Sequence, residues 1–80
     1  MRIHIVNPNT TRAFTDKIAR AAATVKLAET ELLVTQSAMG PVSIEGYYDE
    51  AFSVPGLLQQ VREAEAKGVS GHVIACFDDT

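Results

Sequence analysis

Short apolar runs alternate with longer amphipathic segments along this chain. Three runs rich in β-branched residues predict strands over residues 2–6, 30–35 and 69–77. Between them, apolar residues recur at helical spacing over residues 11–25 and 44–67. The order strand, helix, strand, helix, strand predicts an α/β fold, in which a three-stranded parallel sheet has flanking helices.

The two helical segments differ in regularity. The first places apolar residues on one face, at Phe14, Ile18, Ala21, Ala22 and Val25. Asn9 and Thr10, just before it, are good N-caps. In the second segment, Pro55 and Gly56 are expected to break or kink the helix. An apolar stripe then resumes, and Gly68 suits the position just past the helix end.

The polar loops gather at one edge if the first strand lies between the other two. Residues 7–11, 36–45 and 76–80 then meet at the carboxyl ends of the strands, where open α/β sheets place their sites. The third of these loops carries Cys76, the only cysteine of the chain. A thiol in that place is either a small buried apolar residue or a group that acts in a site.

Two of these loops carry further candidate residues. Residues 7–11 are all polar or proline, which fits either a well-capped turn or a loop whose amides hold a polar group of a ligand. Ser43 could likewise donate a hydrogen bond to a ligand or cap the next helix. The first loop matches neither G-x-G-x-x-G nor G-x-x-x-x-G-K-[ST], which argues against a dinucleotide or a nucleoside triphosphate.

His4 is the other residue with reactive chemistry near the start of the chain. No second histidine, cysteine or carboxylate stands at metal-ligand spacing from it, so no metal site is predicted. We expect His4 to be a strand-edge or partly solvated residue.

Composition excludes several classes of partner. The net charge of −3 gives no electrostatic basis for binding nucleic acid or for a polybasic membrane contact. No apolar stretch approaches the roughly 20 residues of a membrane span, and no secretory signal pattern opens the chain. One cysteine among 80 residues cannot form a disulfide within the chain. A cytoplasmic protein with a reduced thiol is the expectation.

Three strings of residues carry a family resemblance when taken together: Asn7-Pro8-Asn9-Thr10, Ser43-Ile44-Glu45-Gly46-Tyr47-Tyr48-Asp49-Glu50-Ala51 and Ile74-Ala75-Cys76-Phe77-Asp78-Asp79-Thr80. Their combination resembles the hydantoin racemase branch of the aspartate/glutamate racemase superfamily. The resemblance covers all 80 residues and keeps the family's order and spacing. It implies that the strands and helices of this chain form half of a racemase-like α/β domain. The second half would then lie beyond Thr80.

The resemblance also implies roles for individual residues. Proteins of this family use no cofactor, and each of their two similar halves contributes one cysteine that flanks the stereocentre of the substrate. Cys76 matches the first of these catalytic cysteines. Asn7, Asn9 and Ser43 match loops that line the substrate cleft, and Phe77 and Asp78 match the loop beside that cysteine.

The implied activity is cofactor-independent racemisation of a 5-substituted hydantoin or of the related ureide allantoin. Racemisation of an amino acid such as aspartate or glutamate is an alternative. A non-catalytic α/β ligand-binding module, with Cys76 as a core residue only, is another. The expected partner is a small-molecule substrate, with neither nucleic acid nor membrane, and a homo-oligomer of the full-length protein is compatible with the resemblance.

Overall fold

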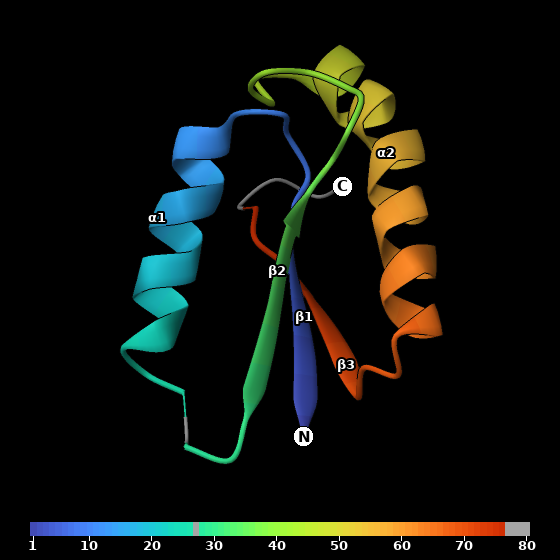
Figure 1. The fold of residues 1–80 in the computed structure, drawn as a ribbon. Helices are drawn as coiled ribbons and strands as arrows, with labels where there is room; N and C mark the ends of the chain where they lie inside the picture. Colours follow the sequence, from blue (N-terminus) through green and yellow to red (C-terminus); the bar gives the residue numbers. More distant parts are fainter. Residues whose placement is uncertain (27, 77–80) are drawn as a thin grey trace.

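The computed structural model describes residues 1–26 and 28–76 (Figure 1). Its elements follow one another as β1 (Arg2–Asn7), α1 (Arg12–Ala23), β2 (Glu31–Gln36), α2 (Tyr47–Ala66) and β3 (Gly71–Ile74). This order confirms the predicted α/β class. β3 is shorter than the predicted strand, and residue 77 of that prediction lies outside the described residues. Ser70 and Ala75 nevertheless extend the pairing, because their N–H groups donate to Arg2 O at 2.7 Å and Val6 O at 2.9 Å.

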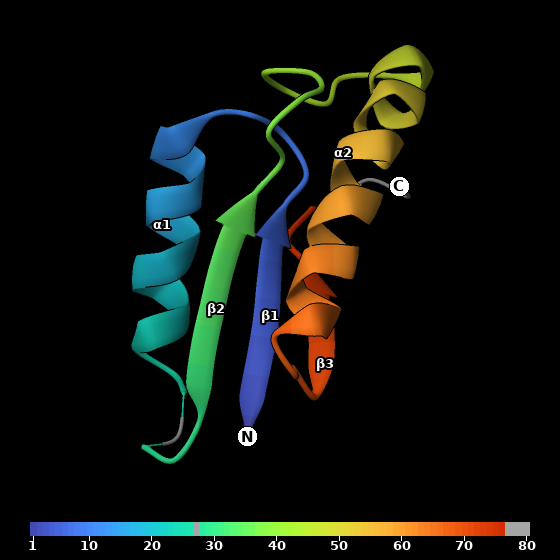
Figure 2. The same ribbon diagram turned by 45° about the vertical axis from the view of Figure 1, so that its right-hand side comes forward.

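The three strands form one parallel sheet in the order β2-β1-β3. Ile5 on the central strand lies opposite Val34 of β2 and Val73 of β3. The expected central position of the first strand is therefore confirmed. The chain passes from β1 to one neighbour and then back across to the other, so right-handed crossovers put the helices on opposite faces. Figures 1 and 2 show α1 on one face of the sheet and α2 on the other.

The apolar core is small and lies mainly between β1 and α2. Its buried members are Ile5, Val6, Leu57 and Ala64. Val25 was expected on the buried face of the first helix, but it follows the end of α1 and is 80% exposed. Neither helix of the described ranges is long and apolar enough to cross a membrane.

The sequence predicted a break or a kink at Pro55 and Gly56. α2 continues through both residues, so the break was wrong. Pro55 is on the exposed side of the helix, where water can satisfy the carbonyl group that loses its N–H donor. Gly56 is buried, and a Cβ added there would lie 2.4 Å from the carbonyl oxygen of Met39. Gly56 is thus the residue that lets α2 approach the β2–α2 loop closely.

His4 is fully buried, which contradicts the expected strand-edge or partly solvated position. β1 is the central strand, so its side chains have neighbours on both sides. Thr35 Oγ1 of β2 lies 2.7 Å from His4 Nε2, and Nδ1 of His72 on β3 lies 2.8 Å from His4 Nδ1. These partners stand far away in the sequence and make burial of the imidazole tolerable.

Candidate active site

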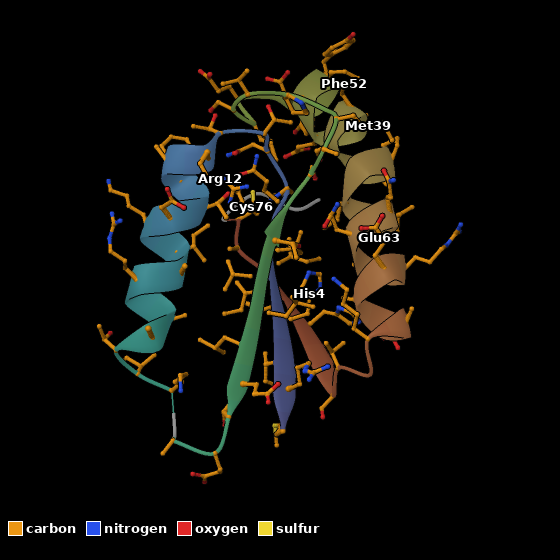
Figure 3. All side chains as sticks on the ribbon, in the orientation of Figure 1. His4, Arg12, Met39, Phe52, Glu63 and Cys76 are labelled. Carbon is orange, nitrogen blue, oxygen red and sulfur yellow. The ribbon has the colours of Figure 1, made fainter. Side chains whose placement is uncertain are left out.

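Cys76 lies just past the carboxyl end of β3. The strand ends at Ile74, and the N–H of Cys76 turns back to donate to the carbonyl oxygen of Ile74 at 2.9 Å. The residue is half-buried and lines a pocket of about 360 Å³ with Ile18, Ile74 and Ala75, here called the Cys76 pocket. Figure 3 shows Cys76 at the carboxyl edge of the sheet, on the side of α1. The thiol therefore stands at the edge where the sequence predicted a site.

A second pocket adjoins the first. This Asn9 pocket measures about 420 Å³, and its lining residues are Asn7, Asn9, Phe14, Lys17, Ile18 and Ala75. Ile18 and Ala75 line both pockets, so the two amide residues and the thiol border one continuous region. Phe14 is 45% exposed here although it belongs to the apolar face of α1.

Asn7 organises the loop that follows β1. Its side chain is buried, and its Nδ2 donates to Asn9 Oδ1 at 2.9 Å and to Thr15 Oγ1 at 3.0 Å. Its Oδ1 accepts from the backbone N–H of Asn9 at 3.2 Å. Asn9 Oδ1 also accepts from the N–H of Thr11 at 2.9 Å. The amide of Asn7 is thus directed at protein acceptors, and a role of this side chain in contacting substrate stays a prediction.

Thr15 and Gln36 complete this network, although neither was proposed from the sequence as a site residue. The Thr15 hydroxyl, 2% exposed as a residue, donates to Gln36 Oε1 at 2.6 Å. Gln36 Nε2 donates in turn to the carbonyl oxygen of Thr10 at 3.3 Å. A polar residue between Phe14 and Ile18, on the face of α1 that turns towards the sheet, was the available signal for Thr15.

The β1–α1 loop is also tied to the β2–α2 loop. The backbone N–H of Thr10 donates to Pro41 O at 3.1 Å, and Thr11 Oγ1 donates to Val42 O at 2.7 Å. Asn9 and Thr10 were expected to cap the N-terminus of α1, but neither of them is the N-cap residue. Thr11 is, and its hydroxyl bonds the neighbouring loop instead of capping the helix. Gly40 permits the turn before Pro41, with φ of +126°.

The remaining predicted site residues are Ser43, Phe77 and Asp78. Ser43 follows Val42 and is half-buried, but it does not belong to the lining of either pocket. Phe77 and Asp78 lie outside the described residues. Within the described ranges, no group of three or more histidine, cysteine, aspartate or glutamate residues could hold a metal ion.

His4, whose pKa is shifted, lies on the opposite side of the sheet from Cys76. Burial, followed by the nearby charges of His72 and Lys67, lowers the pKa of His4 below its ordinary value. His4 lies between the sheet and α2, whereas Cys76 and Ile18 lie on the α1 side (Figure 3). The charged residue that lines the Asn9 pocket is Lys17.

Known proteins resemble this chain over nearly its whole length. It is 48% identical over 79 residues to a hydantoin racemase of Rhizobium meliloti and 43% identical over 79 residues to that of Pseudomonas sp. (strain NS671). Each match covers 99% of this chain but 33% and 32% of the relatives, so the chain spans about a third of their length.

Solved structures agree with these relatives. An allantoin racemase from Klebsiella pneumoniae superposes with a TM-score of 0.93 at 45% identity, over 96% of this chain and 31% of that protein. The sequence model of the family described as Asp/Glu/Hydantoin racemase matches residues 3–80. With this match over almost all of its residues, the chain belongs to the Asp/Glu/hydantoin racemase family.

Proposed function

We propose that this chain is the N-terminal part of a longer, cofactor-independent racemase of 5-substituted hydantoins or of allantoin, with Cys76 as one of two proton-transferring thiols. The second thiol would come from the part of the protein beyond these residues. The substrate would bind at the carboxyl edge of the sheet, against the Cys76 and Asn9 pockets. A cytoplasmic location belongs to the same proposal.

The chemistry requires two opposed groups. To invert a carbon next to a carbonyl group, one base removes the proton from one face and an acid returns a proton to the other face. The thiolate of Cys76 would take the C5 proton, leaving its electron pair on the enolate of the ring. The opposed thiol would then give its proton to the far face and become the thiolate, so the two groups exchange roles. Each such group contributes about 10²–10⁴-fold to the rate.

The position of Cys76 is the observation that carries the proposal. The single cysteine of the chain lies at the carboxyl edge of a parallel sheet and lines a pocket that continues to Asn7 and Asn9. An enolate oxygen needs hydrogen-bond donors. Asn9 Nδ2 and backbone N–H groups of the loop are candidate donors, because Asn9 Oδ1 is occupied within the loop.

The test replaces the thiol in the complete protein. We expect Cys76→Ala to abolish racemisation of a chiral hydantoin and Cys76→Ser to leave little or none, because a hydroxyl exchanges protons poorly without a base beside it. Loss of optical rotation, together with deuterium uptake at C5 from heavy water, is the measurement. Racemisation by the alanine variant at near wild-type rate, or inversion without deuterium uptake, would contradict the two-thiol mechanism.

A second measurement separates the enzyme from a ligand-binding module. In an enzyme of this kind, a hydantoin bound at the carboxyl edge should slow alkylation of Cys76 by a thiol reagent. A thiol that alkylates slowly, with or without the ligand, would favour the module. Running aspartate and glutamate as parallel substrates decides whether the activity is that of an amino-acid racemase instead.

A further inference from the structure

Four side chains at the carboxyl edge form a chain of hydrogen bonds whose direction is fixed at one end. Gln36 Nε2 donates to the backbone carbonyl oxygen of Thr10 at 3.3 Å. Of the two ends of the Gln36 amide, only the NH₂ group can donate. The amide of Gln36 is therefore oriented with Oε1 towards Thr15. Since Oε1 can only accept, the Thr15 hydroxyl must donate its single proton to it, at 2.6 Å.

The orientation of the Thr15 hydroxyl determines how the two asparagines are hydrogen-bonded. With its proton committed to Gln36, the Thr15 oxygen presents a lone pair to Asn7 and accepts from Nδ2 at 3.0 Å. The second hydrogen of Asn7 Nδ2 donates to Asn9 Oδ1 at 2.9 Å. That oxygen also accepts the N–H of Thr11, so the carbonyl end of the Asn9 amide is held by the loop. The NH₂ end of Asn9 is what remains for a ligand, since no described residue accepts a hydrogen bond from it.

We propose that Thr15 and Gln36 are positioning residues. They set the polarity of the loop, meaning the donor-to-acceptor direction of its side-chain hydrogen bonds, so that Asn9 presents an amide donor to a carbonyl oxygen of the substrate. This rests on the proposed function, because it names the substrate group that the same site reads. A ring carbonyl of a hydantoin is such an acceptor, whereas a ring N–H is not. The roles differ from that of Cys76, because neither Thr15 nor Gln36 lines either pocket.

Thr15→Val in the complete protein is the decisive substitution, because it removes the hydroxyl at nearly constant shape. Asn7 and Asn9 can then rotate, and we expect kcat/KM for a 5-substituted hydantoin to fall by about 10-fold or more. Thr15→Ser restores the hydroxyl and should restore the activity. The matched control is Thr24→Val, since the Thr24 hydroxyl donates to Ala21 O at the far end of the same helix and should leave kcat/KM unchanged.

A double-mutant cycle distinguishes positioning from plain stabilisation. Asn9→Asp keeps an oxygen towards the loop but replaces the outward donor by an acceptor. If Thr15 acts through Asn9, adding Thr15→Val to Asn9→Asp costs little further activity, whereas independent effects multiply. Multiplying effects, or a folded Thr15→Val variant with wild-type kcat/KM, would overturn the inference. Gln36→Met provides the same cycle if Thr15→Val does not fold.

One readout does not depend on catalysis. The side-chain NH₂ of Asn7 should exchange slowly with solvent in the wild type and in Thr15→Ser, and quickly in Thr15→Val, as followed by NMR. Slow exchange in all three would overturn the inference even if the protein racemises hydantoins. A wild type that racemises no hydantoin but shows the expected exchange pattern would instead refute the proposed function and leave the polarity of the loop established.

Discussion

The buried His4 ties all three strands to α2, and replacing it with leucine is the sharpest test of the core. His4 Nε2 is bonded to Thr35 Oγ1 of β2, and His4 Nδ1 to His72 Nδ1 of β3 at 2.8 Å. His72 Nε2 lies 2.6 Å from Glu65 Oε1 of α2. The two imidazoles also meet edge to face, with their ring centroids 5.0 Å apart.

The protons in this series of hydrogen bonds, from Thr35 through His4 and His72 to Glu65, can be assigned by elimination. Only one of the two facing Nδ1 atoms can carry a hydrogen. If both rings are neutral and His72 Nε2–H donates to Glu65, then His72 Nδ1 accepts from His4 and His4 Nε2 accepts from the Thr35 hydroxyl.

His4→Leu keeps the volume of the side chain but removes both hydrogen bonds. Each buried polar atom left without a partner costs about 1–3 kcal/mol. His72 retains some solvent access, with a side chain 19% exposed, so its share lies near the low end. We therefore expect a loss of about 2–4 kcal/mol, which lowers Tm by about 4–16 °C in a protein of 150–250 residues.

The lowered pKa of His4 determines how the stability difference between wild type and His4→Leu changes with pH. The pKa of His4 is lowered in the folded state, so as pH falls below about 6.5 the unfolded chain takes up a proton that the native state refuses. Wild-type stability is thus lost between that pH and the lower native pKa, and the leucine variant lacks this loss. The charge of Lys67 acts on this pKa through His4, so its contribution also disappears in the leucine variant. Glu65, which is bonded to His72, is present in both proteins.

Thermal unfolding at pH 7.5 and pH 5.0, followed by circular dichroism, measures both effects. The Tm gap between wild type and His4→Leu should be wide at pH 7.5 and narrower at pH 5.0. Thr24→Val, at the exposed end of α1, serves as the control with a small and constant gap. A gap that stays equal or widens on acidification would show that His4 does not carry the lowered pKa.

Two further predictions concern packing and completeness. Gly56→Ala should destabilise the protein by about 1–3 kcal/mol despite the roughly 1 kcal/mol that alanine gains in a helix, because the new Cβ meets the Met39 carbonyl. Gly46→Ala, with open space around it, is the control. Equal denaturant midpoints for the two variants would refute the steric argument. The 80-residue chain alone should be partly unfolded or aggregate and show no racemase activity, since β2 and β3 are open sheet edges and the core is small; a cooperative melt of a soluble monomer, or measurable inversion of a hydantoin, would refute it.

Local patterns in the sequence were enough to predict what depends on neighbouring residues. The periodicities gave the five elements in order, and the polar stretches after the strands located Cys76, Asn7 and Asn9 at one edge. Gly68 takes a φ of +75° just past α2, as predicted. Each of these features is decided within a few residues of the chain, by side-chain spacing or backbone sterics.

The errors arose where a distant partner decides the outcome. His4 and His72 are 68 residues apart, and no local pattern announces that one will satisfy the other. Thr15 and Gln36 are separated by 21 residues and belong to different elements. The expected break at Pro55 and Gly56 followed intrinsic propensity, whereas α2 is continuous there and Gly56 packs against the carbonyl group of Met39. Tertiary contacts override propensity in this helix.

The two faces of the sheet are stabilised in different ways, and this bears on the site. α2 buries Leu57 and Ala64 against a sheet face that also carries the histidine pair. Within α1, whose residues are all described, only Thr15 is buried, and the neighbouring Phe14 and Ile18 line the pockets instead. Thr15 accepts a hydrogen bond from Asn7 of β1 and donates one to Gln36 of β2, and these bonds hold the first turns of α1 where apolar burial is scarce. Such an arrangement keeps an apolar pocket open beside Cys76 and still fixes the loop that borders it. It follows that Leu57→Ala should lower stability without altering the exchange of the Asn7 amide, whereas Thr15→Val should alter that exchange.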